Sequence, residues 1–258
     1  MNIDGVDIFI ERLQGDNQNL NFVLIHNAGG SHQFFSHQLD ILKKYGNIIW
    51  WDLPGHGNSE PLNSYQMKDL AALVKKICKK LSLNNLCMIG LNNGANIIIE
   101  TVVSQTLPIH SIILIDPPIL MDDSFVKEIH YFIEQLDHPE YDKFVKTLVD
   151  SLFIETTTSN KQIALKAFNK VDKKSLQAIF SELIKWNDSS HGKLKKITYP
   201  TLCLLTDEHH CSYEKIAYEA PHLEIGKVIG SKCWATLEVP EQVNAMIERF
   251  LKLHKNLI

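Results

Sequence analysis

The stretch LCMIGLNNGANI (Leu86–Ile97) decides the fold, because an apolar run of strand length passes directly into a turn flanked by two glycines. Its first half, Leu86–Leu91, carries no charged or amide side chain, so both faces of this strand are expected to be buried. Such strands are typical of the middle of a parallel sheet covered by helices. Four further apolar runs have the same character: Leu20–His26, Gly46–Leu53, Ile109–Asp116 and Tyr199–Thr206.

Between these runs the apolar residues follow a helical spacing. The segment after Ser64 places leucine, valine and isoleucine at intervals of three and four, with lysines on the opposite side, and Ser64 is the expected N-cap. A second amphipathic helix is expected to begin at Pro240. The alternation of strands and helices predicts an α/β fold with a mostly parallel central sheet flanked by helices.

Residues 119–195 interrupt the alternation with helix-like pieces only. These pieces are Phe125–Leu136, Tyr141–Phe153, Lys161–Lys170 and Lys174–Trp186. We predict a core made of residues 1–118 and 196–258, with residues 119–195 inserted as a helical lid over the strand ends, where α/β sheets place their sites.

Composition narrows the class of partner. The chain has 258 residues, 45% hydrophobic residues and a formal net charge of −4, a balance that argues against a nucleic-acid-binding protein. No apolar run approaches the roughly 20 residues of a membrane span, and the N-terminal residues do not resemble an export signal. Five cysteines without paired spacing indicate reduced thiols, so a cytoplasmic protein with no membrane partner is expected.

Several motifs together resemble those of the α/β-hydrolase superfamily, in its small-lid branch of esterases and enol-lactonases. WWDLPGHGNSEP (Trp50–Pro61) is similar to the family's D-x-P-G-x-G-x-S turn, and GLNNGAN (Gly90–Asn96) occupies the place of its nucleophile elbow. The resemblance covers nearly the whole chain through three more segments: VLIHNAGGSHQFFSHQLDIL (Val23–Leu42), YPTLCLLTDEHH (Tyr199–His210) and GSKCWATLEVPEQVNAMIERFL (Gly230–Leu251).

The resemblance also implies that all three catalytic-triad positions are substituted. The serine position falls on Asn92, the acid position on His209 and the histidine position on Cys233. A carboxamide is a poor nucleophile, so conventional serine hydrolysis is not expected. The two backbone N–H groups of the oxyanion hole map to Asn93 and Ala28, and they do not depend on side-chain identity.

Two interpretations of this altered site remain open. In one, the protein is an enzyme with changed chemistry: Cys233 attacks a small acyl-type or hydrophobic substrate, His209 accepts its proton and Asn92 donates to an oxyanion, or the pocket serves a non-hydrolytic step. In the other, the protein is a catalytically inactive relative that binds a small ligand or a protein partner, and Cys233 fills the space of a lost histidine.

The remaining polar and aromatic residues add little chemistry. Neighbouring histidines at 209 and 210 do not have zinc-ligand spacing, so no metal and no cofactor are expected, and His26 and His56 are interpreted as structural. Trp234, next to Cys233, is the better candidate to line the pocket. The aromatic residues of the lid are candidates either for the pocket or for packing between helices: Phe125, Tyr131, Phe132, Phe144, Phe153 and Trp186.

Overall fold

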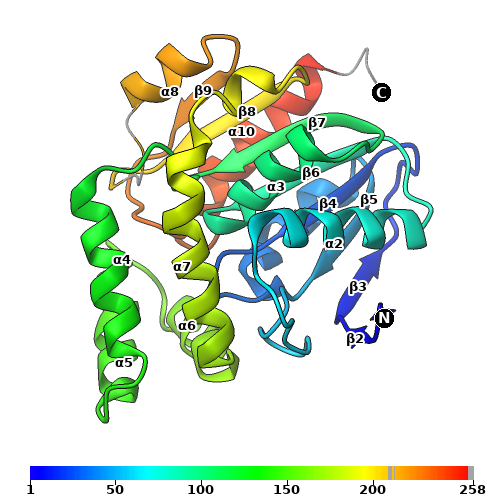
Figure 1. Ribbon diagram of the computed structural model, residues 1–258. Helices are drawn as coiled ribbons and strands as arrows, with labels where there is room; N and C mark the ends of the chain where they lie inside the picture. The colour runs from blue at the N-terminus through cyan, green and yellow to red at the C-terminus, as the bar shows by residue number, and fades with distance from the viewer. Residues whose placement is uncertain (209–210, 212, 255–258) are drawn as a thin grey trace.

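Helices and strands alternate along the chain as the sequence predicts (Figure 1). A computed structural model describes residues 1–208, 211 and 213–254. Its strands are β1 (Asn2–Ile3), β2 (Val6–Asp7), β3 (Ile10–Leu13), β4 (Asn21–Ile25), β5 (Asn47–Trp51), β6 (Leu86–Leu91), β7 (Ile109–Ile115), β8 (Thr201–Leu205) and β9 (Glu224–Lys227). Its α-helices are α1 (Leu39–Lys43), α2 (Met67–Lys80), α3 (Asn93–Ser104), α4 (Asp123–Gln135), α5 (Tyr141–Ser151), α6 (Thr158–Lys170), α7 (Lys173–Ser190), α8 (Tyr213–Glu219), α9 (Ala235–Glu238) and α10 (Pro240–Leu253), with 3-10 turns at His32–Gln38 and Leu194–Lys196.

The central sheet is almost entirely parallel, as predicted. Within the described residues, seven strands pair in the order β3-β5-β4-β6-β7-β8-β9, and only β3 runs antiparallel to its neighbour. The chain moves outward from β4 to β5 on one side and to β6 on the other. The carboxyl ends of β4 and β6 therefore meet at the point where the strand order reverses, which is where open α/β sheets form a crevice for ligands.

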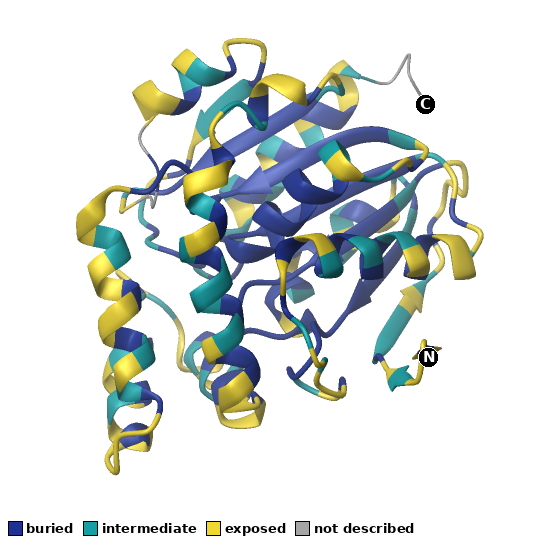
Figure 2. Ribbon diagram, viewed as in Figure 1, coloured by how far each residue is buried: buried dark blue, intermediate teal, exposed yellow. Residues whose placement is uncertain are grey.

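Helices cover both faces of the sheet. In the view of Figure 1, α2 and α3 lie in front of the strands and α10 lies behind them. Every residue of β6 is buried, and so is α3 from Asn93 to Thr101, whereas α2 and α10 bury their inner sides and expose their outer sides (Figure 2). No described helix has both the length and the apolar character that a bilayer span requires.

The predicted N-cap of α2 is wrong. The helix begins at Met67 with Gln66 at the N-cap position, and the Ser64 hydroxyl instead donates to Asp69 Oδ2 at 2.6 Å. The Met67 N–H donates to Glu182 Oε1 at 2.8 Å, so a carboxylate from α7 satisfies the helix start. Glu182, which is 115 residues from Met67 in the sequence, thus accepts the N-terminal N–H that Ser64 was predicted to cap.

Four helices, α4 to α7, lie between β7 and β8 and form a column beside the strand ends (Figure 1). Their boundaries agree closely with the four helical pieces expected from the sequence. Hydrogen bonds join this four-helix segment to the rest of the chain: Asn160 Nδ2 donates to Leu237 O at 2.6 Å, and Trp186 Nε1 donates to Glu100 Oε2 at 2.9 Å. Glu238 accepts from the N–H groups of Ile154 and Glu155.

Two buried, neutral histidines brace the loops after β4 and β5. His26 Nε2 accepts the Leu53 N–H at 2.8 Å, and His56 Nε2 accepts the Gly29 N–H at 3.0 Å. The Nδ1 atom of each ring faces a backbone carbonyl, to which it donates. Burial lowers the pKa of His56 to about 4, and burial together with the charge of His56 lowers the pKa of His26 to about 3. A proton on either Nε2 would face an N–H donor, so these rings must stay neutral in the folded protein.

The free energy of unfolding is expected to fall as the pH falls from about 6.5 to 4. Both histidines have lowered pKa values in the folded state, so the unfolded chain binds more protons in this range. His56 alone accounts for roughly 3 kcal/mol, from about 1.4 kcal/mol per pKa unit. Urea denaturation at pH 7, 6, 5 and 4 measures the loss. The variant His56→Gln retains an acceptor for Gly29 without titrating and should show a shallower dependence; an equal dependence in both proteins would contradict the assignment.

Candidate functional site

The turn between β6 and α3 holds Asn92 in a left-handed backbone conformation, with φ of 45° and ψ of −115°. Two close approaches enforce this turn. A Cβ atom on Gly94 would lie 2.1 Å from Ile25 O, and one on Gly90 would lie 2.5 Å from Ala95 N. The helix therefore packs against β4 and β6 at a distance that only glycine permits, and Asn92 projects at the carboxyl end of the strand.

The Asn92 amide is bound to a neighbouring strand end. Its Nδ2 donates to Asp116 O at 3.0 Å and to Asp116 Oδ2 at 3.1 Å. Asp116 follows β7, is fully buried and itself has a positive φ of 48°. In this arrangement both acceptors of the Asn92 Nδ2 belong to Asp116, and the role of Asn92 as a donor to an oxyanion stays a prediction.

The backbone groups expected to form an oxyanion hole lie at one cavity. Asn93 is the first residue of α3, and its N–H belongs to the unpaired first turn of that helix. Ala28 lies in the loop after β4, where Gly29 has a φ of 76° and Gly30 N donates to Asn27 O at 3.0 Å. Both residues line the cavity beside Asn92.

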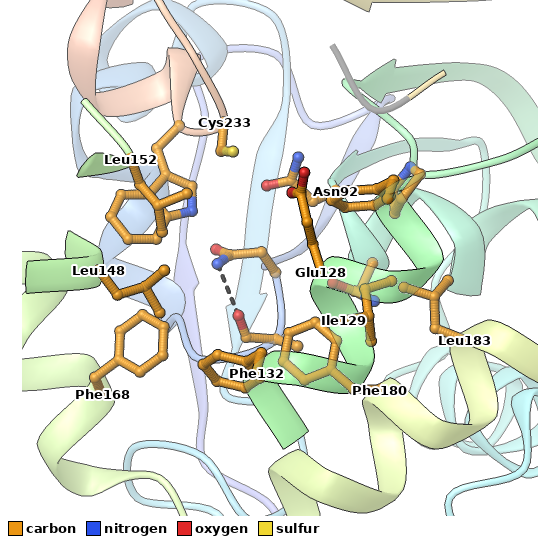
Figure 3. Close-up of a pocket in the computed structure, with 16 residues that line it drawn as sticks. Asn92, Glu128, Ile129, Phe132, Leu148, Leu152, Phe168, Phe180, Leu183 and Cys233 are labelled. Atoms are coloured by element: carbon orange, nitrogen blue, oxygen red, sulfur yellow. Dashed lines mark hydrogen bonds between the residues drawn. The ribbon is translucent and has the colours of Figure 1, made fainter. Parts of the chain in front are cut away.

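This cavity has a volume of about 170 Å³ and lies between the strand ends and the four-helix segment (Figure 3). Its polar lining is formed by Asn27, Ala28, Asn92 and Asn93, together with Cys233, and Figure 3 shows Asn92 and Cys233 on the same side of the cavity. The rest of the wall is apolar, apart from Glu128, and is made of Pro118, Phe125, Ile129, Phe132, Leu148, Leu152, Phe168, Phe180, Leu183 and Trp234. Six site residues were predicted from the sequence. Five of them line this cavity: Ala28, Asn92, Asn93, Cys233 and Trp234.

The aromatic residues of the four-helix segment divide between the cavity and packing between helices. Of those considered from the sequence, Phe125 and Phe132 line the cavity, whereas Trp186 is buried against Glu100 and Tyr131 is 56% exposed. Sequence reasoning missed Phe168, Phe180 and Glu128, which come from α6, α7 and α4. The apolar stripes of these helices mark the two phenylalanines as inward-facing, but no sequence signal marks Glu128.

The sixth residue, His209, lies outside the described residues, so its proposed pairing with Cys233 stays a prediction. The loop before it is joined to the loop that carries Cys233: Asp207 N donates to Ser231 O at 2.9 Å, and Asp207 Oδ2 accepts the Gly230 N–H at 2.6 Å. The hydrogen bond from Gly230 to its carboxylate, with an Asp207–Lys227 ion pair at 3.2 Å, lowers the pKa of Asp207. Among the described residues, no three metal-ligating side chains are grouped.

Cys233 is buried in surroundings that hold its proton. Burial raises the pKa of the Cys233 thiol well above its usual value, and the negative charges of Asp116, Glu208 and Glu238 raise it further. The opposing charge of Lys232 is partly neutralised by Glu208, at 3.2 Å. The described neighbours of Cys233 therefore favour a neutral thiol and oppose the thiolate that a cysteine nucleophile requires.

Comparison with known proteins supports the architecture. The sequence matches no family model and no curated protein. The structure is similar to an esterase from Thermogutta terrifontis, with 17% identity, a TM-score of 0.83 and coverage of 96% of this chain and 94% of that one. It is also similar to an enol-lactonase from Burkholderia xenovorans LB400, with 14% identity, a TM-score of 0.80 and coverage of 97% and 98%.

A third similar structure is a bromoperoxidase from Bacillus anthracis, with 17% identity, a TM-score of 0.82 and coverage of 96% of each chain. The chain has the α/β-hydrolase fold. The predicted fold class is thereby confirmed, and at these identities the similarity extends to the fold alone. Within the α/β-hydrolase fold, the mostly parallel sheet and its flanking helices account for the position of the cavity at the strand ends.

Alkylation of Cys233 at neutral pH is expected to be slow. A raised thiol pKa leaves little thiolate, so iodoacetamide should label Cys233 at pH 7.5 more slowly than it labels a small free thiol, and the rate should still rise above pH 9. Time-resolved intact-mass measurement on the wild type and on Cys233→Ala assigns the label. Labelling of Cys233 faster than the free thiol at pH 7.5 would reveal a thiolate and restore the cysteine–histidine hypothesis.

Proposed function

We propose that this protein binds a small apolar or acyl-type molecule in the cavity beneath α4 to α7 and does not hydrolyse it by a serine mechanism. One observation carries the proposal: the residue at the tip of the elbow, Asn92, is an amide bonded to Asp116 at the polar end of an apolar cavity. Loss of the serine from a catalytic triad costs roughly a million-fold in turnover, so conventional hydrolysis is not expected of this site.

The size of the cavity suggests the size of the ligand. An apolar cavity of about 150 Å³ in another protein holds benzene. The cavity here has about 170 Å³ and is walled by aromatic and aliphatic side chains, which fits a body of one ring or a short chain. An acyl group is in keeping with the two N–H groups at Ala28 and Asn93, and with the esterase and enol-lactonase named among the structural neighbours.

In this proposal, α4 to α7 act as a lid over the cavity. These helices supply most of its apolar wall, including Ile129, Phe132, Leu148 and Phe180. Their attachment to the core includes the bonds from Ile154 and Glu155 to Glu238, which lies shortly after Cys233 in the chain. A catalytically silent, ligand-binding role requires no more than a covered cavity of this kind.

Methyl benzoate is expected to bind in the cavity and to be recovered intact. Its ring fits the apolar wall and its carbonyl oxygen can accept from the backbone N–H groups. Isothermal titration calorimetry should show binding to the wild type. The tryptophan of Leu148→Trp fills the cavity, so this variant should lose about tenfold or more in affinity, which corresponds to about 1.4 kcal/mol. The control Leu253→Trp alters an exposed position on α10 and should bind normally. Equal binding by both variants would place the ligand elsewhere.

Asn92→Ser is expected to fold but to remain inactive as an esterase. Serine restores a hydroxyl at the elbow, yet the neutral thiol of Cys233 offers no base to accept its proton. The variant loses the bonds to Asp116, so a modest drop in thermal stability is also expected. Release of nitrophenol from an activated aryl ester, compared with buffer and with wild type, measures the activity. Turnover typical of a serine esterase in this single variant would overturn the proposal.

A further inference from the structure

Glu128 brings a charge to a cavity that otherwise has none. Among the described residues that line the cavity, Glu128 is the only one with a charged side chain, and it projects from α4 in the direction of Asn92 (Figure 3). No hydrogen bond or ion pair joins its carboxylate to another described residue. Glu128 is solvent-exposed as well as lining the cavity, and its carboxylate can accept a hydrogen bond from a bound molecule.

The backbone groups of the cavity are hydrogen-bond donors, whereas the Glu128 carboxylate is an acceptor. The N–H groups of Ala28 and Asn93 make no hydrogen bond to another described residue, and both residues line the cavity. The Asn93 side-chain Nδ2 is buried without a partner as well. A ligand head that occupies this end can therefore use both polarities, with an acceptor for the N–H donors and a donor for Glu128.

A carboxylate head does not meet both needs. It can accept from the N–H groups, but it has no proton for Glu128 and it adds a negative charge near one already present. An ester satisfies the N–H groups but donates nothing. A carboxamide has a carbonyl oxygen and an N–H group on adjacent atoms, and no charge.

We infer that the cavity selects a neutral carboxamide on a ring-sized apolar body, with the amide N–H donating to Glu128 and the carbonyl oxygen accepting from Ala28 and Asn93. The inference rests on the proposed function, because it assigns the head group of the ligand that this cavity binds. It makes Glu128 a specificity-determining residue, which discriminates amides from acids and esters of equal size.

Benzamide, methyl benzoate and benzoate share a ring and differ in the head group, so calorimetric titration of the three tests the inference. Wild type is expected to bind benzamide about tenfold more tightly than methyl benzoate, and benzoate more weakly still. A hydrogen bond to a charged group raises affinity about tenfold or more. We expect only about tenfold here, because Glu128 is exposed to solvent and the bond competes with water. Glu128→Leu should remove the preference for benzamide over methyl benzoate, and Glu128→Gln should strengthen benzoate binding about tenfold.

Glu134→Gln is the matched control, because Glu134 lies on α4 but does not line the cavity. It should leave all three affinities unchanged. If all three compounds bind but their order is the same in the wild type and in both Glu128 variants, the inference is overturned while the proposed function stands. If none of them binds to the wild type, the proposed function fails first, and the inference fails with it.

Discussion

The hydrogen bonds from the Asn92 amide to Asp116 tie the end of β6 to the end of β7, and the site depends on this link. Both residues have positive φ values, 45° and 48°, a conformation that costs roughly 1–3 kcal/mol in a non-glycine residue. The cost is borne because the turn is held from several sides: Asn92 N donates to Ile115 O, and Asp116 N donates to Leu204 O. The strained elbow therefore persists as part of the sheet, without a nucleophile at its tip.

The loop that carries the Ala28 N–H is held in place by His26 and His56 and not by Asn92. His56 accepts the N–H of Gly29, and His26 accepts the N–H of Leu53, so two neutral rings lock the loops after β4 and β5 together. Ala28 precedes Gly29, and the direction of its N–H follows from this loop rather than from residue 92. The Ala28 donor can thus survive a change of side chain at the elbow, which is why its presence supports ligand binding without specifying a reaction.

Sequence patterns predicted most of this architecture and part of the site. Continuous apolar runs predicted the buried strands, and the motifs that resemble those of α/β-hydrolases predicted that Asn92, Asn93, Ala28 and Cys233 lie in one place. Ser64 failed as a cap because Glu182, distant in sequence, serves the start of α2. The orientation of the Asn92 amide and the position of Glu128 depend on contacts between elements. The period of a helix shows which side chains face inward, but not which of them meet a neighbouring helix and which meet a cavity.

The negative charges near Cys233 affect the protonation of its thiol, and the proposed ligand has to be compatible with the charge of Glu128. Cysteine nucleophiles lie in electropositive surroundings, where a thiolate is stabilised. Here Asp116, Glu208 and Glu238 surround the thiol with negative charge, and Glu128 extends this sign into the cavity. A thiolate at Cys233 and a carboxylate on a ligand are disfavoured for the same reason. In the proposed function, the neutral thiol of Cys233 and the carboxylate of Glu128 both suit retention of an uncharged, hydrogen-bond-donating molecule better than attack upon it.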